Sequence, residues 1–204
     1  MRVARAQDLM ADVGLDALLL TTEPEVRYFT GFLTRSWESP TRPWFLVIPS
    51  RGDPIAVIPS IGTPLMGRSW ITDIRTWRSP DYDDDGVGLL ADALSDYQRV
   101  GVPDGSETHV RMPYADLKQL ENKLGFALKS DVGIMRQLRM VKSTVEIDKI
   151  ELACGVANRA FTRVSEIAHV GVPLRQVFRD FQRLCLEEGA DWVPYLAGGA
   201  EQGG

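Results

Sequence analysis

Apolar residues recur along residues 1–132 with two periods, one typical of helices and one typical of strands. Residues 3–13 show helical spacing and predict an amphipathic helix, whereas the apolar run at 16–21 predicts a buried strand. Apolar runs at 44–48 and 54–58 flank a Ser-Arg-Gly-Asp turn and predict a β-hairpin. The other expected elements are helices at 24–29, 61–69, 89–97 and 114–124, and strands at 71–77, 99–102 and 126–128. Strands that alternate with helices, plus one hairpin, predict an α/β domain with a mixed sheet flanked by helices.

The pattern changes in residues 133–204. Ser143 and Glu146 have the spacing of a capping box, in which each side chain satisfies a backbone N–H of the other residue. Apolar residues then recur at alternating spacings of three and four, which predicts a helix of about 25 residues that ends at Gly171. A second striped helix follows, and residues 192–196 are expected to form an edge or irregular strand. These elements cannot bury both of their faces, so this unit is expected to need further chain or a partner.

The charge and the cysteines of the chain indicate which partners and which compartment to expect. The chain has 23 basic and 28 acidic residues and a net charge of −5, which argues against a general nucleic-acid partner or an anionic membrane surface. No apolar run has the length or the flanks of a signal peptide or a membrane span. Cys154 and Cys185 lie on apolar faces of the two predicted helices, so we expect buried reduced thiols and a cytoplasmic protein.

No cluster in the sequence has the composition of an active site. A metal centre needs carboxylate, His or Cys ligands gathered at short spacings, and we interpret the widely separated His109 and His169 as surface residues. The acidic stretch 81–85 lacks the glutamate that ends a calcium loop, so a solvated loop that caps the next helix is favoured. The sequence therefore predicts no metal site and no catalytic residue within this chain.

One loop has a composition that suits ligand binding. Residues 35–44 place two tryptophans, Trp37 and Trp44, and two arginines, Arg35 and Arg42, between predicted strands. An aromatic wall with guanidinium groups beside it suits a carboxylate-bearing small molecule or a peptide end. In the alternative interpretation the tryptophans cap the sheet and Arg42 stacks upon them. Arg42 and Trp37 are the candidate substrate-binding residues.

Three segments of the chain resemble parts of one known family. Gly14–Leu20 and the following Glu25-Val-Arg-Tyr-Phe-Thr-Gly-Phe32 are similar to the family's first strand and its N-x-x-Y-x-T/S-G-F turn, with Glu25 where Asn is frequent. Leu138-Arg-Met-Val-Lys-Ser-Thr-Val-Glu-Ile147 is similar to an R-x-x-K-S-x-x-E-I element that opens the catalytic domain. The third segment is the pair of striped helices with Gly171-Val-Pro between them. The sequence thus resembles the creatinase / Xaa-Pro aminopeptidase family of pita-bread metallohydrolases.

The resemblance implies a creatinase-like N-terminal α/β domain in residues 1–132 and the truncated start of a pita-bread catalytic domain in residues 133–204. Peptidases of the family carry two divalent metal ions (Mn, Co or Zn) on two Asp, one His and two Glu. Those motifs and the catalytic histidine would follow Gly204, so none is carried over to this chain. In the creatinase branch a neighbouring subunit offers an arginine to the substrate carboxylate, and Arg42 matches that arginine.

The implied function is that of the N-terminal fragment of a hydrolase whose parent cleaves an Xaa-Pro peptide bond or a small amide. Family members form homodimers or larger oligomers in which N-terminal domains close the partner's active site. The fragment is therefore expected to supply oligomerisation and closure of the substrate site, and to be inactive alone. The alternative is a non-catalytic pita-bread-like binding module, since relatives exist that have lost their metals and bind proteins.

Overall fold

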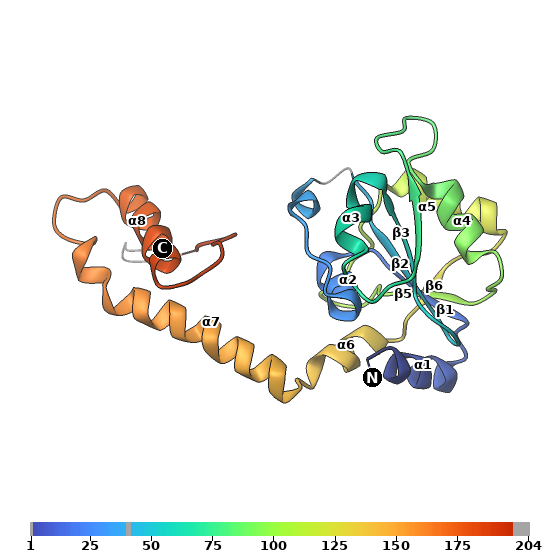
Figure 1. Cartoon of the computed structure of the whole chain (residues 1–204), viewed down its shortest axis with the longest axis horizontal. Helices are drawn as coiled ribbons and strands as arrows, with labels where there is room; N and C mark the ends of the chain where they lie inside the picture. The colour runs from blue at the N-terminus through green and yellow to red at the C-terminus, as the bar shows by residue number, and fades with distance from the viewer. Residues whose placement is uncertain (1, 40–41, 198–204) are drawn as a thin grey trace. The chain divides into compact units, whose positions relative to one another are not determined.

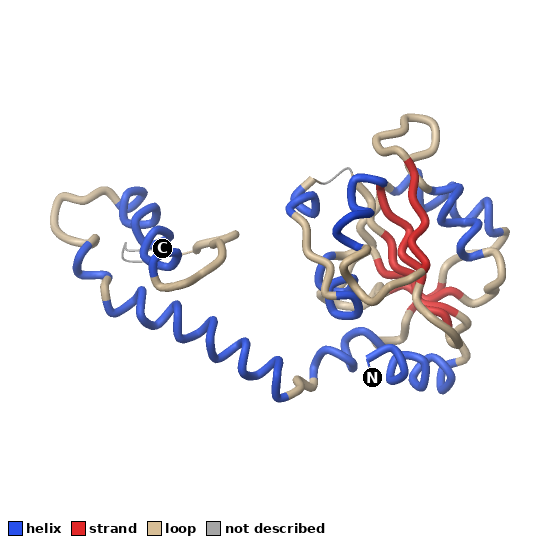
Figure 2. The backbone as a smooth tube through the Cα atoms, viewed as in Figure 1, coloured by secondary structure: helices blue, strands red, loops and turns tan. Residues whose placement is uncertain are grey.

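The computed structural model describes residues 2–39 and 42–197 (Figure 1). Contacts within the chain separate two compact units, Met1–Val141 and Lys142–Gly204. The first unit contains a sheet with helices on both of its faces, whereas the second is helical (Figure 2). Across the described residues, no helix is both long and apolar enough to cross a membrane.

The first unit is built on one six-stranded mixed sheet. Its strands lie in the order β4-β3-β2-β1-β5-β6. β2 runs antiparallel to both neighbours, and the remaining pairs are parallel. The predicted α/β fold with a mixed sheet and one hairpin is therefore confirmed. The elements are α1 (Arg2–Val13), β1 (Ala17–Leu20), α2 (Glu23–Thr30), η1 (Arg35–Glu38), β2 (Phe45–Pro49), β3 (Ile55–Pro59), η2 (Ser60–Gly62), α3 (Thr63–Met66), β4 (Asp73–Trp77), α4 (Val87–Leu94), β5 (Val100–Val102), α5 (Tyr114–Leu124), β6 (Lys129–Ser130) and α6 (Ile134–Met140).

The central strands are buried on both faces because helices cover each side of the sheet. In β1, Leu18 and Leu20 join one apolar cluster, and Ala17 and Leu19 join the other. Successive strand residues point to opposite faces, so an uninterrupted apolar run is what a sheet covered on both sides requires. Helices α1, α2, α3 and α6 contribute to the first cluster, and α4 and α5 contribute to the second.

The first unit continues past the boundary that the sequence suggests at residue 132. Helix α6 packs against α1, and Ile134, Met135 and Leu138 belong to the same buried cluster as that helix. Asp131 holds the start of α6, because its buried carboxylate accepts the N–H of Gly133, the residue before the helix, at 2.8 Å and that of Met135 in the first turn at 2.9 Å. The last strand also begins later than expected, at Lys129 instead of residue 126.

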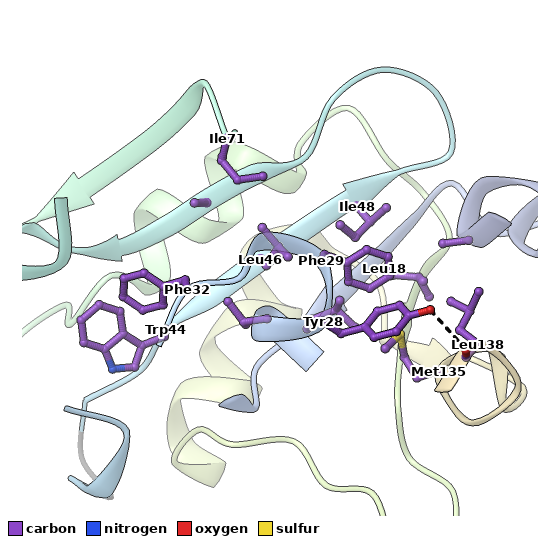
Figure 3. Close-up of a cluster of buried hydrophobic side chains, with 14 of the residues drawn as sticks. Leu18, Tyr28, Phe29, Phe32, Trp44, Leu46, Ile48, Ile71, Met135 and Leu138 are labelled. Carbon is purple, nitrogen blue, oxygen red and sulfur yellow. Dashed lines mark hydrogen bonds between the residues drawn. The ribbon is translucent and has the colours of Figure 1, made fainter. Parts of the chain in front are cut away.

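Tyr28 joins three segments of the first unit. Its hydroxyl donates a hydrogen bond to the Leu138 carbonyl of α6 at 3.2 Å (Figure 3). The Arg2 guanidinium lies 4.2 Å from the centre of the Tyr28 ring and also donates to the Tyr28 carbonyl. The conspicuous Tyr of the Tyr-Phe-Thr-Gly-Phe run therefore connects α2 with the N-terminal helix and with α6.

The second unit consists of α7 (Thr144–Thr162), η3 (Val164–Glu166) and α8 (Leu174–Glu187). The predicted capping box is present, since the Ser143 N–H donates to the Glu146 carboxylate at 2.8 Å and the Glu146 N–H to Ser143 Oγ at 3.4 Å. Residues 192–197 form no strand with any part of the described chain.

Helix α7 is shorter than the sequence pattern predicts. It ends at Thr162, where the Arg163 N–H turns back to the Ala160 carbonyl and a short 3-10 turn follows. The Arg163 guanidinium is paired with three glutamates, which holds this turn in place: Glu166, Glu187 and Glu188. These three ion pairs favour a bend where apolar spacing alone predicted more helix.

The apolar stripe of α7 is mostly uncovered within its own unit. Among the described residues of this unit, the buried apolar cluster is small and consists of Ala160, Ile167, Phe181, Leu184 and Cys185. The stripe residues Ile147 and Ile150 are exposed, and Phe161 is 64% exposed. Cys154 is also exposed, so its predicted burial is wrong, while Cys185 is buried as expected.

We expect Tyr28→Phe to lower the free energy of unfolding of the first unit by about 1 kcal/mol, because it removes one buried hydrogen bond and keeps the ring. Urea unfolding followed by tryptophan fluorescence measures this change, since Trp37, Trp44, Trp70 and Trp77 all lie in that unit.

Tyr82→Phe is the matched control, because the Tyr82 side chain is 98% exposed and is expected to leave stability unchanged. Equal effects of the two substitutions would contradict a stabilising role for the Tyr28 hydroxyl.

Candidate substrate-binding loop

The tryptophan-containing loop connects α2 to β2 and begins with the short turn η1. Thr34 precedes this turn, and its hydroxyl accepts the Ser36 N–H at 3.2 Å, which fixes the start of η1. Trp37 is 7% exposed and Trp44 is 1% exposed, so both indoles are part of the apolar cluster under α2. Their ring centres lie 5.8 Å apart, and Phe32 packs 5.3 Å from Trp44 (Figure 3).

Gly62 provides the space that the Trp44 ring occupies. A Cβ atom placed on Gly62 would lie 2.3 Å from the Trp44 ring, far inside van der Waals contact. Glycine at the end of η2 is therefore required by the close approach of an aromatic ring. The position of Trp44 in turn sets where the loop enters β2.

A guanidinium does stack on Trp37, but it belongs to Arg111. This side chain reaches the loop from the segment that precedes α5, and its central carbon lies 5.3 Å from the Trp37 ring centre. Arg111 donates to the carbonyl of Arg42 at 2.7 Å and to that of Trp37 at 3.2 Å, and it also donates to the Ser39 carbonyl. Burial lowers the pKa of the Arg111 guanidinium from its ordinary value, but arginine remains charged in proteins.

Arg42 is half-buried, and its backbone is held while its side chain stays available. Its carbonyl is engaged by Arg111. Among the described residues, no hydrogen bond or ion pair engages the Arg42 guanidinium. The loop thus brings Trp37 and Arg42 to one place, with Arg111 between their carbonyls. Sequence reasoning missed Arg111, because a single arginine far along the chain gives no local pattern.

The remaining sequence candidates have structural roles or lie at the surface. His109 and His169 are both exposed. In the acidic loop, the Asp84 carboxylate accepts the Gly88 N–H at 2.9 Å, and that of Asp85 accepts the Trp77 indole N–H at 2.8 Å. The described residues contain no group of three or more His, Cys, Asp or Glu that could hold a metal ion. They therefore do not provide the two-metal ligand set that the family resemblance implies.

Two surface hollows of the first unit lie away from this loop. One of about 490 Å³ lies between α4 and α5, with Asp92 and Lys123 in its lining. Another of about 390 Å³ is lined by Gln7 and Trp70 among others. Neither is lined by Trp37 or Arg42.

The first unit is a three-layer α/β/α domain with a central mixed sheet and an arginine-anchored loop between α2 and β2. The family model described as the creatinase/prolidase N-terminal domain matches residues 2–141, and the chain belongs to this family. The matched range ends where the first compact unit ends, at Val141.

Relatives and solved structures extend the likeness into the second unit. A probable dipeptidase PepE of Mycobacterium bovis is 28% identical over 201 residues, which are 98% of this chain and 51% of the relative. The crystal structure of dipeptidase PepE from Mycobacterium ulcerans has a TM-score of 0.74 at 28% identity and covers 95% of this chain and 50% of that one. An Xaa-Pro dipeptidase from Bacillus anthracis shares the fold, with a TM-score of 0.75 at 16% identity over 94% of this chain and 50% of that one. The chain spans about half the length of the curated relatives it matches.

We expect Gly62→Ala to lower the free energy of unfolding of the first unit by about 1–3 kcal/mol, because the added methyl group displaces the Trp44 ring from a filled core. Urea unfolding measures the loss, and a change in tryptophan fluorescence of the folded state reports the displacement.

Gly105→Ala serves as the control, since a Cβ there meets no atom within 4 Å. The close approach at Gly62 is refuted if both variants retain the unfolding midpoint of the parent chain.

Proposed function

We propose that this chain is the N-terminal part of a hydrolase of the creatinase / Xaa-Pro aminopeptidase type. The observation that carries the proposal is the match of residues 2–141 to the creatinase/prolidase N-terminal domain, with an alignment to a probable dipeptidase that continues over 98% of the chain. In this proposal the first unit closes the substrate site, in a homodimer, and Lys142 begins the catalytic domain. The parental substrate is an Xaa-Pro peptide or a related small amide.

The exposed stripe of α7 supports a second unit that is completed by further chain. Ile147 and Ile150 are exposed on a helix whose own unit buries a small cluster among its described residues. A helix with an apolar face on one side is stable when that face packs against another element. A catalytic domain continuing beyond this chain would supply such an element.

The chemistry of the parent is assigned to residues outside the described chain. Two divalent metal ions, of Mn, Co or Zn, would activate water for hydrolysis in the complete enzyme, and the described residues lack a ligand cluster for them. The contribution of this chain is therefore recognition of the substrate. The 204 residues alone are proposed to be inactive.

Arg42 is the residue proposed to recognise the substrate, with the Trp37 region beside it. A guanidinium pairs with a carboxylate through two parallel N–H bonds, which gives both affinity and orientation. The terminal carboxylate of an Xaa-Pro dipeptide is such a group. Two observations support this role, in which Arg42 acts on the site of the neighbouring subunit. The Arg42 carbonyl is held by Arg111, and no described residue engages the Arg42 guanidinium.

The runner-up is a non-catalytic binding module on the same fold, and the lack of a metal-ligand cluster in the described residues is compatible with it. The reading frame after codon 204 discriminates between the two. Codons for the order Asp…Asp…His…Glu…Glu favour the enzyme, and a stop codon favours the module.

We expect the full-length product to hydrolyse an Xaa-Pro dipeptide with added Mn²⁺ or Co²⁺, and the 204-residue chain to show no turnover. In the full-length product, Arg42→Met should raise KM by about 10- to 100-fold, because a charge-assisted hydrogen bond to the substrate carboxylate is lost. Steady-state kinetics with the dipeptide measures both effects.

Arg51→Met is the matched control, since Arg51 is an exposed arginine of the β2–β3 turn and should leave KM unchanged. Turnover by the 204-residue chain, or an unchanged KM in Arg42→Met, would count against the proposal.

A further inference from the structure

Arg111 contacts the candidate loop at several points. Its guanidinium donates to the carbonyls of Trp37, Ser39 and Arg42, which span the loop from η1 toward β2. Its charged plane also lies over the Trp37 ring at 5.3 Å. A single side chain therefore fixes the directions of three backbone carbonyls and one aromatic ring.

The Arg111 backbone connects this loop to the central sheet. Its N–H donates to Thr21 Oγ1 at 2.7 Å. Thr21 is 2% exposed and directly follows β1, the strand at the centre of the sheet. Arg111 and Thr21 therefore connect the loop to the buried centre of the sheet.

The charge of Arg111 is balanced by carbonyl dipoles instead of a carboxylate. Among the described residues, no acidic side chain forms an ion pair with it. Arg111 is half-buried, and partial removal of a cation from water is costly unless its donors are hydrogen-bonded. The three loop carbonyls supply those hydrogen bonds. Lysine cannot replace this arrangement, because its single ammonium lacks the planar set of donors that reaches several acceptors.

We propose that Arg111 is a positioning residue for substrate recognition, which holds the backbone at Trp37, Ser39 and Arg42 so that the Arg42 guanidinium is presented to a substrate carboxylate. Arg111 itself does not touch the substrate, because its donors face the loop carbonyls. This inference rests on the proposed function for the role of Arg42. The positioning of the loop can be tested without any activity.

The first experiment is limited proteolysis of the 204-residue chain with a glutamate-specific protease. The readout is the rate of cleavage after Glu38, in the loop, divided by the rate after Glu121, in α5 of the same unit. Arg111→Met should raise this ratio about tenfold, because cleavage requires local opening of the loop that the three hydrogen bonds oppose. Global unfolding would raise both rates and leave the ratio near its starting value.

Two further variants sharpen the result. Arg111→Lys keeps the charge and most of the aliphatic stem, and it should also raise the ratio, since one ammonium cannot engage all three carbonyls. Arg75→Met is the control, because Arg75 pairs with Asp73 on β4 and makes no bond to the described residues of the loop. A ratio that stays at the parental value in both Arg111 variants overturns the inference, whatever the fate of the proposed function.

The second experiment measures steady-state kinetics of the full-length product with an Xaa-Pro dipeptide. Arg111→Met should raise KM about tenfold and change kcat less than about twofold, because only carboxylate binding is affected. The double variant Arg42→Met/Arg111→Met should show the KM of Arg42→Met alone, since Arg111 acts through Arg42. Additive effects of the two substitutions would overturn that coupling, and an unchanged KM in Arg42→Met alone would overturn the proposed function instead.

Discussion

The first unit depends on the burial of its central strand on both faces. Four successive residues of β1 are fully buried, and they alternate between two apolar clusters. Such a strand is stable only when helices cover each side of the sheet. That requirement explains why α6 belongs to the first unit: Ile134, Met135 and Leu138 complete the cover on the side of α1. A sheet that is covered by helices on both faces is a rigid scaffold, and such a scaffold can position a surface loop.

The loop between α2 and β2 is connected to β1 through hydrogen bonds of Arg111. Thr21 directly follows β1, and its hydroxyl accepts the Arg111 N–H. The Arg111 guanidinium then donates to the carbonyls of Trp37 and Arg42. Trp44 anchors the other end of the loop in the core, in space that Gly62 leaves free. Among the described residues of the loop, Trp37, Arg42 and Trp44 are therefore held by residues distant in sequence. The candidate binding residues Trp37 and Arg42 therefore depend on Arg111 for their positions.

Local patterns predicted most elements of the fold, while distant contacts account for the differences. The helix at 3–13 and the hairpin followed from apolar spacing and turn residues, and both are present. The end of α7 was mispredicted because Arg163 pairs with Glu187 of α8 and with Glu188, which directly follows that helix, and no spacing rule includes such pairs. Arg111 could not be found in the same way: it contacts carbonyls 69 to 74 positions earlier in the chain, and carbonyl acceptors leave no sequence signature.

Two sources of stability differ in size at the start of the second unit: the capping box at Ser143 and the burial of apolar side chains on α7. The Ser143–Glu146 capping box satisfies its own backbone groups and contributes about 1 kcal/mol wherever the helix lies. Burial of one large apolar side chain such as Ile150 or Phe161 contributes about 1.5–3 kcal/mol, and these residues are exposed on α7. The cap can therefore specify where the helix begins, but the stability of the second unit depends mainly on what covers its stripe. A short local motif is thus a strong marker of the domain boundary and a weak source of the stability beyond it.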